Sequence, residues 1–158
     1  MVNLISCLDR QFAELHRGHC EMMSAIAPEL LYRRPSGSAS LSPVRSCGEY
    51  VLRSAATVEQ TFGGITTNLW DDPFEWTLPE TLTTPEKVID YLGEVENTRR
   101  RGFELFHRDE DLFKEVMAPS GKIELLPLLL DTLTRAAHHQ GGATATLELL
   151  HAISRGAV

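Results

Sequence analysis

The longest uninterrupted helical pattern in the chain runs from Leu125 to Ser154. Pro127 falls in its first turn, where the backbone N–H has no intrahelical partner, and no proline follows. Arg135 and His139 are four residues apart, so they share one side of a helix. We therefore predict a single long helix over 125–154. Gly141 and Gly142 fall in its middle, where each costs roughly 1 kcal/mol against alanine, which predicts close approach of another backbone.

Three further helices are predicted from apolar residues that recur at steps of three and four. The first covers Val2 to about Ala27. The second begins at Ser42 and Pro43, which suit an N-cap and a first helical position, and ends near Phe62, before two glycines. The third begins at Pro85 and ends near His107.

The remaining segments are connections. A long irregular connection, 66–83, joins the second and third helices. A turn signal within 116–121 predicts a small hairpin or a plain loop before the last helix. Four long amphipathic segments without a run of strands predict an all-α four-helix bundle, in which the apolar stripes face inward.

Composition limits the class of protein. The 158 residues suit one domain, 1–158, and we expect no membrane partner because no apolar run approaches the roughly 18 residues of a membrane span. Charges throughout the first 23 residues argue against a signal peptide, and three cysteines without CxxC spacing indicate reduced thiols, so we expect a cytoplasmic protein. A net charge of −7 argues against nucleic acid as a partner. We interpret Arg99–Arg101 as a solvated helix face, and His16 and His19 as surface histidines.

The sequence resembles the DinB/YfiT-like superfamily of four-helix bundles. The match lies in AAHHQGGATATLELL, which contains His138 and His139, and more weakly in RSCGEYVL, which contains Glu49. The resemblance covers nearly the whole chain, including the long loop between helices 2 and 3. It implies an up-down-down-up bundle and a homodimer.

The family's usual metal site uses one histidine on the second helix and two histidines, four residues apart, on the last. His139 matches the second of that pair, but Arg135 stands at the first. Arg53 or Ser54 stands at the position on the second helix. An arginine stays protonated and has no lone pair to give a metal. We therefore expect no metal and no cofactor, with a divalent metal such as nickel or zinc at His139 as the alternative.

Two interpretations of these residues stay open. If Arg53 and Arg135 face one cavity, two guanidinium groups and an imidazole form a pocket for a small anionic ligand. Alternatively, Glu49 and Arg53 form an intrahelical ion pair that closes the cavity. The candidate pocket residues are Glu49, Arg53, Arg135, His138 and His139. The hypotheses are therefore an anion-binding DinB-like protein of unknown function, a metal-dependent hydrolase or small-thiol S-transferase, and a purely structural homodimer.

Overall fold

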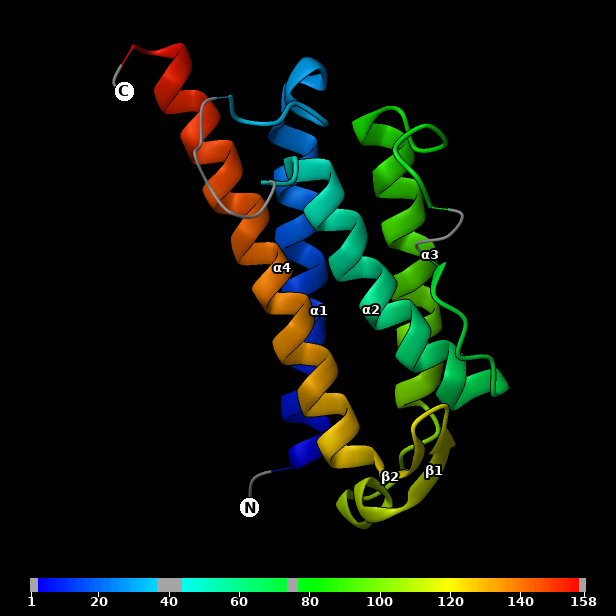
Figure 1. Ribbon diagram of the computed structural model, residues 1–158. Coiled ribbons are helices and arrows are strands. Elements are labelled where there is room, and N and C mark those ends of the chain that lie inside the picture. Colours follow the sequence, from blue (N-terminus) through cyan, green and yellow to red (C-terminus); the bar gives the residue numbers. More distant parts are fainter. Residues whose placement is uncertain (1–2, 37–43, 74–76, 157–158) are drawn as a thin grey trace.

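Four helices dominate the computed structural model, which describes residues 3–36, 44–73 and 77–156 (Figure 1). They are α1 (Leu4–Ala25), α2 (Cys47–Thr67), α3 (Pro85–Phe103) and α4 (Leu125–Ser154). Two short 3-10 helices, η1 (Pro28–Leu30) and η3 (Asp109–Phe113), and a hairpin of β1 (Glu115–Ala118) and β2 (Gly121–Glu124) complete the described elements. The predicted all-α bundle is confirmed.

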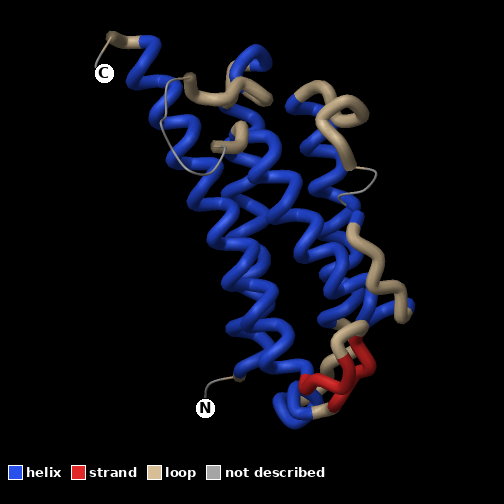
Figure 2. The backbone as a smooth tube through the Cα atoms, viewed as in Figure 1, coloured by secondary structure: helices blue, strands red, loops and turns tan. Residues whose placement is uncertain are grey.

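The helices run up, down, down and up in the view of Figure 1, so α1 is parallel to α4 and α2 is parallel to α3. α1 and α2 each contact both α3 and α4. Because α2 and α3 run in the same direction, the connection between them has to return along the length of the bundle. Figure 2 shows the hairpin at the end of the bundle where α4 begins.

The second helix differs from the prediction at both ends. It begins after Ser46, whose hydroxyl accepts from Glu49 N while the Glu49 carboxylate accepts from Ser46 N, a capping box. The predicted start at Ser42 and Pro43 lies outside the described residues. The helix continues through Gly63 and Gly64 and ends at Asn68, which adopts φ 57°. An asparagine tolerates this left-handed conformation, so it can end a helix as a glycine does.

The third helix is shorter than predicted, whereas the last one has the predicted bounds. α3 ends at Phe103 because the chain turns there into the loop before η3, and the apolar pattern up to Phe106 continues without helical backbone. The hairpin pairs Glu115 with Glu124 and turns at Pro119 and Ser120, and Gly121 follows with a φ of +112°. A positive φ of this size favours glycine.

The core of the bundle is built on three aromatic rings from different helices. Phe12 of α1, Phe62 of α2 and Phe103 of α3 have ring centroids 5.2 to 5.9 Å apart, and all three are buried. Each of these side chains brings a large apolar area into one contact, and the Phe12–Phe62 pair is edge-on at 86°, which adds to that burial. The cluster joins α1, α2 and α3 in the core.

Buried hydroxyl groups join α2 to α4. The Ser54 hydroxyl donates to the Ala136 carbonyl over 2.8 Å, and the hydroxyls of Thr61 and Thr132 lie 2.7 Å apart. Because buried polar groups are costly without partners, these bonds fix the rotation of the two helices about each other. No helix in the described part of the chain is long and apolar enough to span a membrane.

The two glycines of α4 have different surroundings. A Cβ at Gly142 would lie 2.8 Å from the Tyr50 ring, while a Cβ at Gly141 would meet nothing within 4 Å. The prediction of a close backbone is therefore wrong in detail. Gly142 makes room for an aromatic side chain of α2, and nothing in the described chain approaches Gly141.

Candidate functional site

A polar pocket of about 70 Å³ lies between α2 and α4. It brings together three of the five predicted site residues: Arg53 from α2, and Arg135 and His139 from successive turns of α4. Its lining residues are Arg53, Ala56, Thr57, Gln60, Asp72, Arg135 and His139. The spacing of four residues on α4 places both of its side chains on the side that faces α2.

Arg53, and not Ser54, is the residue of α2 that lines this pocket. Ser54 is fully buried, and its hydroxyl donates to the Ala136 carbonyl. Neighbouring residues on a helix point about a hundred degrees apart, so this bond turns Arg53 toward the pocket. Burial and the nearby Arg45 lower the pKa of Arg53, while the carboxylates of Asp72 and Glu49 raise it. An arginine stays charged under these conditions.

His139 presents a neutral imidazole to the pocket. Its ring is half buried, its centroid lies 6.3 Å from that of Tyr50, and its Nδ1 is buried without a hydrogen-bond partner among the described residues. Burial lowers the pKa of His139, and the neighbouring His138, Arg53, Arg45 and Arg135 lower it further. An anion placed among these groups would reverse that effect.

Thr57, Gln60 and Arg135 each have a partner within the protein. The Thr57 hydroxyl donates to the Arg53 carbonyl over 2.9 Å, and Gln60 Nε2 donates to the Trp70 carbonyl over 2.9 Å. Arg135 Nη1 lies 3.6 Å from Asp131 Oδ2 in an exposed pair one turn apart. Exposed pairs of this kind contribute little, so the guanidinium is available for a ligand at small cost.

Glu49 and His138 lie outside the pocket lining. The Glu49 carboxylate is bound to Arg34 and caps α2 through Ser46. Among the described residues, Glu49 forms its ion pair with Arg34 and not, as the alternative interpretation expects, with Arg53. His138 is exposed, and its ring centroid lies 5.8 Å from that of His139.

The donor set of the pocket does not fit a three-histidine metal centre. Two of the three positions carry guanidinium groups, which offer no lone pair to a metal. Nowhere in the described ranges do three His, Cys, Asp or Glu side chains gather closely enough to hold a metal ion.

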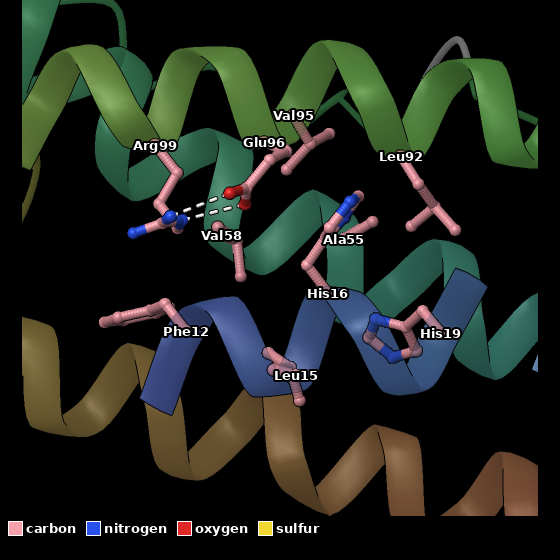
Figure 3. Close-up of a pocket in the computed structure, with 10 residues that line it drawn as sticks. All are labelled: Phe12, Leu15, His16, His19, Ala55, Val58, Leu92, Val95, Glu96 and Arg99. Carbon is pink, nitrogen blue, oxygen red and sulfur yellow. Dashed lines mark hydrogen bonds and ion pairs between the residues drawn. The ribbon is translucent and has the colours of Figure 1, made fainter. Parts of the chain in front are cut away.

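A second cavity, of about 20 Å³, lies between α1, α2 and α3 on the opposite side of α2 (Figure 3). Its walls are mostly apolar, with His16, His19, Glu96 and Arg99 as the polar members. A volume of this size holds about one water molecule. His19 is 2% exposed, its Nε2 has no hydrogen-bond partner in the described chain, and burial lowers its pKa to about 4. A single water bound in the cavity would satisfy that nitrogen.

The sequence interpretation of this region is wrong for two residues. His19 was expected on the surface, and Arg99 on a solvated face, yet both are buried. Arg99 donates to Glu96 over 2.8 and 2.7 Å and is also paired with Asp9. The missed signal is the spacing: His19 continues the buried stripe of Phe12 and Leu15, and Arg99 continues that of α3.

The remaining polar groups near this cavity do not form an activated thiol. Cys20 Sγ lies 3.6 Å from His16 Nε2. However, burial and the Glu96 carboxylate raise the pKa of Cys20, and a reactive cysteine needs the opposite shift. Burial also lowers the pKa of His16. The cluster is consistent with packing of neutral side chains, so the pocket between α2 and α4 is the better candidate site.

Together, the fold and the pocket define a four-helix bundle with a long connection between α2 and α3 and a polar site between α2 and α4. The same fold occurs in the crystal structure of a "putative member of the DinB family" from Exiguobacterium sibiricum 255-15. The two structures agree with a TM-score of 0.67 over 96% of this chain and 94% of that one, at 20% sequence identity. The predicted DinB-like fold is thereby confirmed. Searches of protein-family models and of curated protein sequences gave no match to this chain.

Proposed function

We propose that this DinB-like protein binds a small anionic ligand in the pocket between α2 and α4. The observation that carries the proposal is that Arg53, Arg135 and His139 line one polar pocket. Two guanidinium groups offer forked donors that match carboxylate or phosphate oxygens, and the imidazole can add a third donor after protonation. We also propose that the three-histidine metal site implied by the family resemblance is lost here.

Thermal unfolding in the presence of acetate, phosphate or sulfate tests the proposal. A ligand at 100 times its dissociation constant adds about 2.7 kcal/mol of stability, which raises the midpoint temperature of a domain of this size by roughly 5–10 °C. We expect Arg135→Ala to abolish that shift. Arg101→Ala, which removes an exposed arginine of α3, is the matched control and should keep it. The proposal fails if no anion stabilises the protein or if both variants respond alike.

Elemental analysis of the purified, untagged protein tests the second part. The guanidinium groups at two of the three positions lead us to expect no stoichiometric transition metal. One equivalent of nickel or zinc that disappears in His139→Ala would instead support the metal-dependent hydrolase or transferase hypothesis.

A homodimer through the outer face of α4 is a further proposal. Leu130 is 47% exposed, and Ala137 and Gly141 are exposed on the same side of the helix. Because a Cβ at Gly141 meets nothing in the described chain, Gly141→Arg leaves the protomer intact and places a bulky charge on this face. Gly93→Arg is the matched control on α3, since Gly93 has equally open surroundings. Sedimentation should show a monomer for Gly141→Arg and a dimer for the control, and two identical results would contradict the proposed face.

A further inference from the structure

The wall of the α2–α4 pocket contains acceptors as well as donors. Arg53, Arg135 and His139 supply positive charge or N–H groups, whereas Thr57, Gln60 and Asp72 line the same 70 Å³. An anion alone interacts only with Arg53, Arg135 and His139. The chemistry of Thr57, Gln60 and Asp72 therefore indicates which further groups a ligand would carry.

Thr57 offers a ligand a hydrogen-bond acceptor in this arrangement. A hydroxyl has one donor hydrogen and two lone pairs, and the hydrogen of Thr57 is already directed to the Arg53 carbonyl. This bond lies within one turn of α2. The lone pairs of the hydroxyl can accept from a donor on the ligand.

Gln60 adds a second acceptor. Its Nε2 donates to the Trp70 carbonyl over 2.9 Å, which orients the amide and leaves Oε1 as an acceptor. Trp70 is held in turn because its ring packs on Gly64, where a Cβ would collide with it. The amide is thus fixed by the backbone that follows α2.

Asp72 contributes a negative charge to the wall. Its charge opposes part of the decrease that burial and Arg45 cause in the pKa of Arg53. It also repels any ligand that is only an anion, while it attracts an ammonium group and accepts from a hydroxyl. A ligand with both an anionic group and a donor satisfies the two sides of the pocket at once.

Building on the proposed anion-binding function, we propose that the pocket binds a small acid with a hydroxyl or ammonium group on the carbon next to its anionic group. The anionic group lies toward Arg53, Arg135 and His139. The hydroxyl or ammonium group donates toward Thr57, Gln60 and Asp72. Hydroxy acids and amino acids have this pattern, and so do the corresponding phosphonates.

Calorimetric titration with matched probes tests this proposal. Acetate, glycolate and glycine share a carboxylate and differ in the neighbouring group, and methylphosphonate with hydroxymethylphosphonate forms the same comparison for a phosphorus acid. We expect the probe with the donor to bind about tenfold more tightly than its plain partner. The series with the higher affinity identifies the carboxylate or the phosphonate as the anionic group.

Variants separate this inference from the anion-binding function. Asp72→Asn should raise the affinity for acetate, because a repelling charge is removed, and should reduce the advantage of glycine. Thr57→Val should reduce the advantage of glycolate, with circular dichroism to verify the fold. If acetate binds and neither glycolate nor glycine binds more tightly, this inference is overturned while the proposed function stands. If no probe binds, the proposed function fails and the inference fails with it.

Discussion

The Ser54 hydroxyl donates to the Ala136 carbonyl over 2.8 Å, and both residues are buried where α2 crosses α4. Each is next to a pocket residue in the sequence, Ser54 to Arg53 and Ala136 to Arg135. Because neighbouring residues on a helix point about a hundred degrees apart, this hydrogen bond orients Arg53 and Arg135 toward the pocket that both line. A buried bond between helices is one element that positions the candidate site.

Ser54→Ala tests that role. Loss of one buried hydrogen bond should lower the free energy of unfolding by about 1 kcal/mol, because the bond replaces hydrogen bonds to water. Urea unfolding measures the change, and Ser24→Ala on the exposed face of α1 is the control, with an expected change close to zero. Equal effects in the two variants would show that the bond contributes nothing.

His19 should make the protein less stable in mild acid. Its pKa is about 4 in the folded protein and near 6.5 in the unfolded chain, so only the unfolded chain takes up a proton between these values. The contribution of His19 to the free energy of unfolding is fully present above pH 6.5 and is lost as the pH drops toward 4. The loss is about 2 kcal/mol between pH 7.5 and pH 5. Urea unfolding at several pH values should show a shallower slope for His19→Leu. The exposed His107→Leu is the control, and an unchanged slope in His19→Leu would contradict the assignment.

Glu49 should stabilise the start of α2 more through its cap than through its ion pair. Burial raises the pKa of its carboxyl, but Arg34 and Ser46 outweigh burial and hold the pKa at about 2. The stability it contributes is therefore present above pH 4.5 and is lost as the pH falls toward 2.

Two substitutions separate the cap from the ion pair. Glu49→Ala should cost about 1–2 kcal/mol at pH 7, as expected for loss of a cap, while Arg34→Ala should cost less than about 1 kcal/mol, since the Arg34 side chain is 57% exposed. Thermal unfolding of both variants provides the comparison. A larger loss in Arg34→Ala would mean that the ion pair dominates.

The adjacent glycines of α4 should respond to alanine in opposite directions. Gly141→Ala meets open space and should gain up to about 1 kcal/mol from helix propensity. Gly142→Ala places a methyl group 2.8 Å from Tyr50 Cε1, so the ring has to move and the gain is lost. Denaturant unfolding measures both, and a stabilising Gly142→Ala would show that the Tyr50 ring yields easily.

Helix periodicity predicted the architecture, and the structure explains where it failed. The predicted bounds of α4 are confirmed because one helical pattern runs without a break from Leu125 to Ser154. The predicted end of α2 is wrong because Gly63 and Gly64 are ordinarily helix breakers, whereas here the helix continues through both and Trp70 packs against Gly64. Such a contact involves a residue outside the helix, so local propensity does not contain it.

The pocket residues could be predicted only through the spacing of Arg135 and His139 and the family resemblance. The sequence favours Arg53 and leaves Ser54 as the alternative if the register slips by one residue, since the choice depends on the rotation of α2. His19 and Arg99 were assigned to the surface by residue type, although their spacing placed them on buried stripes. Asp72 had no signal at all, because it comes from the irregular segment after α2.

The parallel course of α1 and α4 has a mechanical consequence. The described chain begins at one end of the bundle and finishes at the other (Figure 1). A force that pulls its two ends apart therefore slides α1 along α4 and loads their contacts in shear, among them the bond from Gln140 to the Leu15 carbonyl. These contacts are loaded at the same time, whereas peeling from one end would break them one after another. The bundle should resist stretching between its termini better than peeling from one end.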